Sequence, residues 1–388
     1  MPSTTSTVCA ALAAAAALPW SSAAPSNLLW NTSLAEFKQD LVDIKFGWGK
    51  LYVSTTAQAI FLDNNTGKVL ESYELDDYGC YIWTSRASVI PLEQEDSAVE
   101  ARNGYLEGFK GMNHNHSLWK TTPDFQCPYL DSVSSRAVVA TNFTHYAFAS
   151  TENGDMWTEQ FCTYDNQATG NLYLIEPTTG NDTFALLTVW SDDNEGGVNT
   201  TMFNAVTGDV QWKNQSDIVT WFSYEPVNDV LIENNLPSIL RARDWRDWNK
   251  SPLWSLDVST ANFGAYTVDD SGRLIVFDDG SGGVEAYDVK TAKQEWKVNG
   301  HVLLNTKSAN IVTGSEYFYH VYSIDDGQDY LDVVVEKRKL DGGTDVWTHK
   351  NVAKVKYGWI HAQLSEDETI LYLWSTIDAS WVSAFDVR

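Results

Sequence analysis

Short apolar runs that start at polar turns recur along the second half of the chain. Residues 228–232 (NDVLI) and 272–276 (GRLIV) are two of them, and each is followed by a turn rich in Asp, Asn, Thr or Gly. Short apolar runs bounded by these turn residues are typical of β-strands joined by tight hairpins. The pattern therefore predicts an all-β chain.

Tryptophans give this pattern a period. Trp212, Trp254 and Trp296 follow one another at intervals of 42 residues. Four predicted strands in a unit of about 42 to 51 residues are the signature of a propeller blade. We therefore predict that residues 24–388 form one β-propeller of eight, alternatively seven, four-stranded blades. Three further tryptophans fall roughly in step with the period: Trp119, Trp157 and Trp347.

The two ends of the chain match the two parts of one blade. Residues 383–388 (SAFDVR) are similar to residues 285–289 (EAYDV), which precede a predicted hairpin, whereas residues 28–31 (LLWN) match a strand that follows one. We predict that the N- and C-terminal strands pair and complete the last blade. This pairing would remove the open edge that a partial ring leaves.

The hairpin motif at residues 203–212 (FNAVTGDVQW) and 287–296 (YDVKTAKQEW) resembles the tryptophan-docking repeat of the PQQ-like (quinoprotein alcohol dehydrogenase-like) β-propeller superfamily. That superfamily includes quinoprotein dehydrogenases and bacterial outer-membrane assembly propellers. The resemblance is clear over residues 200–388 and weaker upstream. The enzymes cover their quinone with a disulfide between adjacent cysteines beside a calcium ion, and this chain has no adjacent cysteines and no C-x-x-C-H. These differences from the enzymes favour a non-catalytic member, and the N-terminal sequence favours a secreted one.

The N-terminus has the pattern of a secretory signal. Residues 8–18 (VCAALAAAAAL) form an apolar run of 11 residues, which is too short to span a bilayer, and small residues follow Pro19. We predict a signal peptide over residues 1–23, and a secreted, extracellular chain with no membrane span. N-glycosylation sequons agree with this prediction. They lie at Asn31, Asn64, Asn115, Asn142, Asn181, Asn199, Asn214 and Asn249.

Composition and net charge limit which classes of partner the chain could bind. The 17 Trp, 18 Tyr and 15 Phe residues suit a pleated sheet surface. With 26 Lys and Arg against 52 Asp and Glu, the formal net charge is −26. Nucleic-acid phosphates would repel such a chain, so no nucleic-acid partner is expected. In an oxidising compartment we expect one disulfide among Cys80, Cys127 and Cys162, and the pairing stays open.

No contiguous catalytic motif occurs in the chain, so no residue is assigned a catalytic or metal-binding role. His114 and His116 could share a metal, although a solvated loop beside Asn115 is the favoured interpretation. Acidic, turn-prone clusters at residues 192–195, 278–282 and 325–329 could hold calcium, but Asp-Gly hairpins look the same without any ion. We expect no cofactor, with calcium as the open alternative.

A second set of aromatic residues precedes the central strand of several units, as in the near copies KFGW and KYGW. Because the first strand of a blade is innermost, we predict that these rings face the central channel and stack on a sugar or a flat organic ligand. The alternative is packing between blades. The set comprises Trp48, Trp83, Trp221, Phe263 and Trp359.

Residues 241–248 (RARDWRDW) form a basic, aromatic stretch in an acidic chain. Arg and Trp are enriched at binding hot spots, so Arg243 and Trp245 are candidate ligand-binding residues. The alternative is a self-paired surface segment in which Asp244 and Asp247 neutralise Arg243 and Arg246.

The leading functional hypothesis is a secreted glycoprotein that acts as a binding or scaffold propeller for a glycan or an extracellular protein. The alternative is a glycan-processing hydrolase or lyase, because two carboxylates in the propeller funnel could flank a sugar bond without any contiguous motif. A PQQ-dependent oxidoreductase is the third hypothesis.

Overall fold

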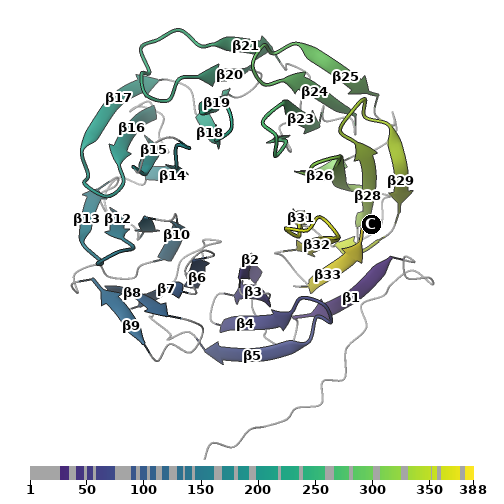
Figure 1. The fold of residues 1–388 in the computed structure, drawn as a ribbon, viewed down its shortest axis with the longest axis horizontal. Helices are drawn as coiled ribbons and strands as arrows, with labels where there is room; N and C mark the ends of the chain where they lie inside the picture. Colours follow the sequence, from purple (N-terminus) through teal and green to yellow (C-terminus); the bar gives the residue numbers. More distant parts are fainter. Residues whose placement is uncertain are drawn as a thin grey trace, which may run out of the picture.

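A computed structural model of the chain describes residues 27–34, 41–47, 50–55, 58–74, 89–92, 97–102, 105–110, 116–121, 129–133, 136–141, 145–160, 168–178, 182–191, 198–216, 220–235, 239–257, 266–278, 283–299, 306–324, 331–350, 352–355, 360–375 and 381–388. Within these ranges all regular elements are β-strands, and no helix is long and apolar enough to cross a membrane. The strands form eight sheets arranged as a ring (Figure 1). The predicted signal peptide lies outside the described residues.

We number the sheets as blades in chain order. Blade 1 holds β2 (Leu41–Gly47), β3 (Lys50–Thr55), β4 (Gln58–Asp63) and β5 (Val69–Glu74). Blade 2 holds β6 (Val89–Leu92), β7 (Ser97–Arg102), β8 (Tyr105–Lys110) and β9 (Ser117–Lys120). Blade 3 holds β10 (Tyr129–Val133), β11 (Ala137–Thr141), β12 (His145–Ser150) and β13 (Met156–Gln160). Blade 4 holds β14 (Ala168–Ile175), β15 (Phe184–Ser191), β16 (Val198–Asn204) and β17 (Val210–Ser216).

Blade 5 holds β18 (Thr220–Glu225), β19 (Val230–Asn235), β20 (Ile239–Arg243) and β21 (Trp254–Asp257). Blade 6 holds β22 (Tyr266–Val268), β23 (Leu274–Asp278), β24 (Val284–Asp288) and β25 (Gln294–Val298). Blade 7 holds β26 (Thr306–Thr313), β27 (Tyr317–Ile324), β28 (Leu331–Lys339), β29 (Asp345–His349) and the short β30 (Lys354–Val355), which pairs with β28. Blade 8 holds β31 (Ile360–Leu364), β32 (Ile370–Ser375), β33 (Trp381–Asp386) and β1 (Leu28–Ser33).

The predicted all-β propeller is confirmed, and it has the eight-bladed form among the described residues. Seven blades have four strands, whereas blade 7 has a fifth, β30, which the sequence pattern did not predict. The predicted closure is confirmed as well. β1 pairs antiparallel with β33, with Trp30 opposite Ala384 and Thr32 opposite Val382, so both ends of the chain share blade 8.

The apolar triplets form the core between blades. Residues 230–232 and 274–276 lie in the second strands β19 and β23 and are buried. Alternate residues of each strand point to opposite faces of its sheet. Ile275 therefore packs toward blade 5, with Ile232 and Trp254, whereas Leu274 and Val276 pack with Phe318 of blade 7. Blade 6 is therefore buried on both faces by its neighbours.

The hairpins between the third and fourth strands explain why an Asp or Asn is followed three residues later by a Thr in the hairpin motif. In blade 1, Asp63 Oδ1 accepts hydrogen bonds from the amide (2.8 Å) and the hydroxyl (2.9 Å) of Thr66. In blade 6, Asp288 Oδ1 accepts the same pair of bonds from Thr291, at 2.8 and 2.6 Å. An Asp side chain that caps its own turn in this way stabilises the tight hairpin.

The periodic tryptophans lie on outermost strands and dock on the next blade. Trp296 donates its indole N–H to Leu340 O, and a Cβ built at Gly343 would lie 2.9 Å from Cε3 of Trp296. Gly343 also has a φ of 65°, so the turn that receives the indole requires glycine. The indole N–H bonds of this kind join Trp30 to Asn64 O (3.0 Å), Trp157 to Ala205 O (3.0 Å), Trp212 to Trp245 O (2.8 Å), Trp254 to Val289 O (2.5 Å) and Trp296 to Leu340 O (2.8 Å).

A buried charged cluster lies in blade 7, on the face that packs against blade 6. Glu336 is 2% exposed, accepts hydrogen bonds from Tyr322 Oη (2.9 Å) and Arg338 Nε (2.8 Å), and lies beside His320. Burial alone would raise the pKa of Glu336, but His320 and Arg338 outweigh burial and lower it to about 2. The ionised carboxylate is thus the form that stabilises the fold.

This lowered pKa predicts acid sensitivity. The contribution of Glu336 is present above its unfolded pKa of 4.5 and should be lost as the pH falls toward 2. It amounts to about 3 kcal/mol at neutral pH. We expect Glu336→Gln to be less stable than the wild type at pH 7, with the gap closing between pH 4.5 and 2 in urea unfolding. A gap that is the same at both pH values would contradict this assignment.

Candidate functional site

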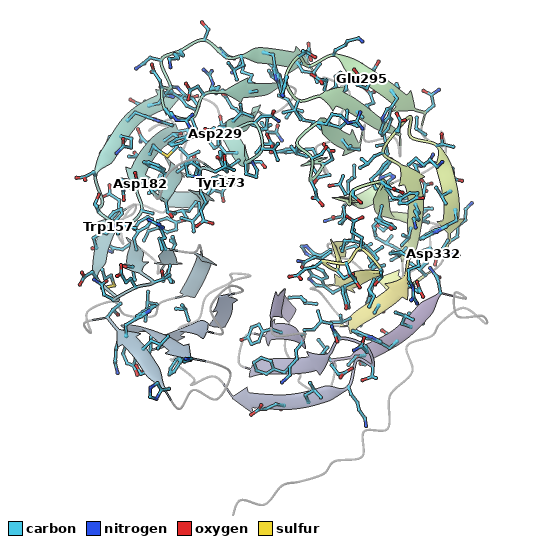
Figure 2. All side chains as sticks on the ribbon, viewed as in Figure 1. Trp157, Tyr173, Asp182, Asp229, Glu295 and Asp332 are labelled. Atoms are coloured by element: carbon cyan, nitrogen blue, oxygen red, sulfur yellow. The ribbon has the colours of Figure 1, made fainter. Side chains whose placement is uncertain are left out.

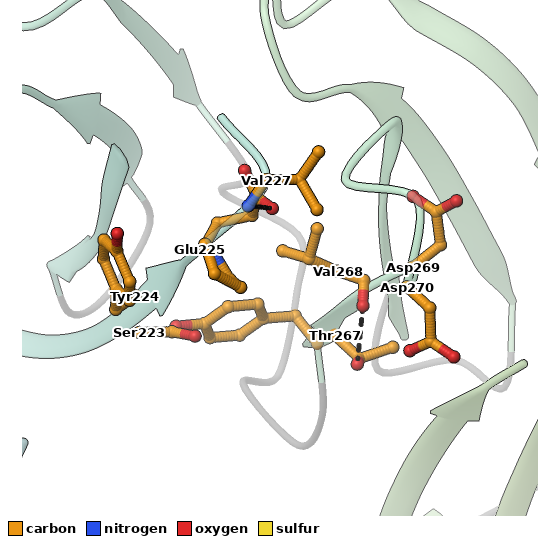
Figure 3. A pocket seen from close by; sticks show the side chains of 10 residues that line it. Ser223, Tyr224, Glu225, Val227, Thr267, Val268, Asp269 and Asp270 are labelled. Atoms are coloured by element: carbon orange, nitrogen blue, oxygen red, sulfur yellow. Dashed lines mark hydrogen bonds between the residues drawn. The ribbon is translucent and has the colours of Figure 1, made fainter. Parts of the chain in front are cut away.

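A pocket of ≈ 530 Å³ lies between blades 5 and 6. Its walls are the ends of the innermost strands β18 and β22 and the turns that follow them. Figure 3 shows Glu225 and Val227 on one wall and Asp269 and Asp270 on the other. The lining residues are Ser223, Tyr224, Glu225, Pro226, Val227, Tyr266, Thr267, Val268, Asp269 and Asp270.

The wall from blade 5 is held by a capped turn. Glu225 is 2% exposed, and its two carboxylate oxygens each accept a backbone N–H at 2.7 Å, from Val227 and Asn228. Asn228 Nδ2 then donates to Gly272 O of blade 6 at 2.6 Å. Gly272 has a φ of 65°, and a Cβ there would lie 2.6 Å from Glu225 Oε1, so the contact requires glycine. The turns of the two blades are therefore locked together.

The wall from blade 6 carries two adjacent aspartates that differ in burial and hydrogen bonding. Asp269 is 4% exposed and accepts hydrogen bonds from the Ser271 hydroxyl and the Leu274 amide. Asp270 is exposed. Partial burial raises the pKa of Asp270, and the negative charges of Glu368 and Asp269 raise it further. Asp270 is thus the pocket carboxylate that a ligand can reach.

Two tyrosines complete the polar lining. Tyr224 donates its hydroxyl to Asp229 Oδ1 at 2.6 Å. Burial raises the pKa of Tyr224, and the hydrogen bond to Asp229 raises it further. Burial also raises the pKa of Tyr266, whose ring contributes to the pocket wall. Both phenols therefore stay neutral hydrogen-bonding groups at physiological pH.

A second pocket, of ≈ 370 Å³, lies between blades 4 and 5 and contains the predicted residue Trp245. The indole of Trp245 is 5% exposed, donates to Asp229 Oδ1 at 2.8 Å and lies beneath the guanidinium of Arg246, 4.5 Å from its ring centre. Figure 2 labels Asp229 and Asp182 in these two neighbouring blades. The lining residues are Pro177, Asp182, Phe184, Gln211, Trp212, Trp245 and Arg246.

Arg243, the other candidate in this segment, is paired within its own sheet. Its guanidinium bonds to Glu233, which is 4% exposed, and stacks 4.7 Å above the ring of Trp248. The self-paired alternative expected Asp244 or Asp247 as partners of Arg243, and this was wrong because Glu233 lies on the adjacent strand β19. For Arg246 the partner Asp244 is confirmed, at 3.4 Å, and Asp229 is a second. The ligand-binding roles of Arg243 and Trp245 stay predictions.

Most of the predicted channel aromatics lie outside the described residues. Trp221 lies in the innermost strand β18, opposite Asn234, as expected for the first strand of a blade. A ligand role for this set stays a prediction. The four members outside the described ranges are Trp48, Trp83, Phe263 and Trp359.

The structure describes only some of the predicted glycosylation, disulfide and ion sites. Asn199 and Asn249 are exposed, and Asn31, Asn64 and Asn214 are half-buried. Among the described residues no three His, Cys, Asp or Glu side chains converge as metal ligands, and the calcium alternative stays a prediction. The predicted residues outside the described ranges are Asn115, Asn142, Asn181, Cys80, Cys127, Cys162, His114, and the acidic clusters at 192–195 and 325–329.

The sequence pattern did not predict the pocket between blades 5 and 6. Residues 228–232 and 272–276 are recognisable in it only as strands, whereas the turns at their start also form the rim of this pocket. The available signal was the acidic residues just before each turn, Glu225 in one blade and Asp269-Asp270 in the next. Only the packing of consecutive blades brings these two segments face to face.

Comparison with known proteins identifies the fold. No protein-family model matches the chain, and no curated protein matches its sequence significantly. Sqt1 from Saccharomyces cerevisiae matches with a TM-score of 0.61 at 11% identity, over 93% of this chain and 99% of Sqt1. The quinohemoprotein alcohol dehydrogenase ADHIIG from Pseudomonas putida HK5 matches with a TM-score of 0.61 at 10% identity, over 93% of this chain and 76% of the enzyme.

BamB from Moraxella catarrhalis matches with a TM-score of 0.55 at 13% identity, over 92% of this chain and 99% of BamB. The likeness to BamB and to the quinohemoprotein enzyme supports the predicted β-propeller fold, and membership of the PQQ-like superfamily stays a prediction. The computationally designed protein Ika8 matches as well, with a TM-score of 0.59 at 12% identity, over 93% of this chain and 100% of Ika8. Similarity at 10–13% identity therefore shows the fold alone.

Proposed function

We propose that this chain is a secreted glycoprotein that acts as a binding or scaffold propeller and holds a protein partner at the pocket between blades 5 and 6. The pocket itself is the observation that supports this proposal. It is ≈ 530 Å³ in volume, and its rim is fixed by hydrogen bonds that join two blades. A preformed recess on rigid turns is the usual form of a binding site.

The carboxylates of the pocket favour binding over glycan hydrolysis. Glu225 and Asp269 each accept backbone N–H groups, so both are committed to holding turns. A glycosidase needs two carboxyl groups that can exchange protons or attack the sugar. Asp270 alone has no hydrogen bond within the described residues. Among the described residues, this pocket therefore lacks a pair of carboxylates that could act together in hydrolysis.

A protein partner also suits the pocket better than a glycan. Sugar hydroxyls both donate and accept hydrogen bonds, so a glycan site needs donors and acceptors in similar number. The hydroxyls of Tyr224 and Thr267 already donate to Asp229 and to Val268 O, and the charged groups of the lining are all carboxylates, which only accept hydrogen bonds when ionised. We therefore propose a protein ligand, and binding of a glycan is the alternative result of the test.

The test screens the secreted wild-type protein and two charge variants against arrayed extracellular proteins and arrayed glycans. Asp270→Lys places a positive charge in the pocket, and Glu71→Lys makes the same change at an exposed site on β5, in blade 1. We expect a protein ligand whose affinity falls about tenfold or more with Asp270→Lys and stays unchanged with Glu71→Lys. Circular dichroism checks that both variants fold.

Two results would overturn the proposed function. One is a protein ligand that both variants bind as tightly as the wild type. The other is turnover of an arrayed glycan that is abolished by Asp270→Asn while binding persists, since that result would identify an enzyme.

A further inference from the structure

We infer that the pocket between blades 5 and 6 recognises a basic side chain, arginine or lysine, presented by the protein partner. The inference rests on the proposed binding function and adds the chemistry of the ligand. It is carried by the shape of the pocket together with the groups that line it.

Each wall of the pocket combines apolar and acidic groups. Pro226, Val227 and Val268 supply apolar surface, and Val227 is 55% exposed. The charged groups are carboxylates, and none of the ten lining residues is Lys or Arg. Arginine and lysine have the matching form, an aliphatic stem with a cationic head, and such stems pack along apolar surface while the head reaches polar groups.

Three carboxylates line the pocket. Asp269 and Asp270 are adjacent on one wall, and Glu225 lies on the other (Figure 3). Glu225 and Asp269 keep their positions because backbone amides hold them, so they supply fixed negative potential. Asp270 is the exposed carboxylate and can form a charge-assisted hydrogen bond, which is the stronger class of hydrogen bond.

A neighbouring turn adds a fourth negative charge. Glu368 of blade 8 accepts hydrogen bonds from the amide (2.9 Å) and the hydroxyl (3.0 Å) of Ser315, which hold its carboxylate in place. The charges of Glu368 and Asp269 raise the pKa of Asp270, after partial burial as the first cause. A bound cation would relieve this repulsion. The formal net charge of −26 would also draw basic partners toward the ring.

Two blocked pentapeptides test the inference directly. They are Gly-Ser-Arg-Ser-Gly and the same peptide with citrulline, which keeps the shape of arginine and removes its charge. Titration of the full secreted chain in about 50 mM NaCl should show the arginine peptide binding about fivefold more tightly. The difference should shrink in about 500 mM NaCl, because salt screens a partly exposed ion pair.

Matched variants separate the pocket from the general negative charge of the chain. Asp270→Asn should abolish the preference for arginine over citrulline, whereas Glu71→Gln removes the same charge from β5 and should leave the preference intact. Equal binding of the two peptides by the wild type would overturn the inference, and so would equal effects of the two variants. A partner that depends on Asp270 but lacks basic residues would overturn only this inference and leave the proposed binding function standing.

Discussion

Replacing Trp254 with alanine is expected to lower the free energy of unfolding by about 3–5 kcal/mol, the usual cost of removing a buried tryptophan. Trp254 is 9% exposed and packs with Ile232 of its own blade and with Ile275 and Val289 of blade 6. Its indole N–H also bonds to Val289 O. One substitution therefore removes both packing and a hydrogen bond across a boundary between blades. Urea unfolding followed by tryptophan fluorescence measures the change.

Two controls define what this result means. Trp254→Phe keeps an aromatic ring and loses the hydrogen bond to Val289 O, so it should cost about 1 kcal/mol in addition to a small packing loss. Glu71→Ala changes the equivalent position of blade 1, where an exposed Glu71 lies opposite Phe61 and replaces the tryptophan. It should change stability by less than about 0.5 kcal/mol. If Trp254→Ala were as mild as Glu71→Ala, the docking tryptophans would not be holding the ring.

Deleting residues 27–33 is expected to destabilise the ring by about 5 kcal/mol or more. The deletion removes β1, leaves the edge of β33 unpaired and takes away Trp30, which is 8% exposed. The loss combines about 3–5 kcal/mol for the buried indole with about 1 kcal/mol for each lost hydrogen bond. Thr32 contributes one such bond, from its hydroxyl to Gly67 O at 2.7 Å. The loss is comparable with the total stability of many proteins.

A peptide in trans distinguishes closure from a general folding defect. A synthetic peptide of residues 27–34 should bind the deleted chain and restore a cooperative unfolding transition, because it supplies the missing strand of blade 8. The same peptide with Trp30→Ala should restore much less, since it can pair with β33 but cannot dock on blade 1. A deleted chain as stable as the wild type would show that β1 does not close the ring.

The architecture was predictable because it depends on local, repeated signals. The interval of 42 residues between Trp212, Trp254 and Trp296 reflects one docking contact made by successive blades, and the hairpin motif reflects a side chain capping its own turn. The match between residues 28–31 and the strand after a hairpin predicted the closure that β1 and β33 make. The fifth strand of blade 7 lacked such a repeat.

The candidate site was not predictable for the opposite reason. Asn228 and Gly272 are 44 residues apart and meet only because consecutive blades lie side by side. Arg243 could be given a partner in its own segment from the sequence, but its partner Glu233 lies on the adjacent strand. Contacts across strands and blades depend on register, which composition and spacing do not reveal.

Hydrogen–deuterium exchange can show whether the pocket between blades 5 and 6 is a binding site. Exchange is followed on the full secreted chain with and without a saturating concentration of the blocked arginine pentapeptide. We expect slower exchange at residues 223–227 and 266–270, with no change around Trp212 and Trp245 in the second pocket. Protection in the second pocket alone, or protection in neither pocket, would contradict binding at the pocket between blades 5 and 6.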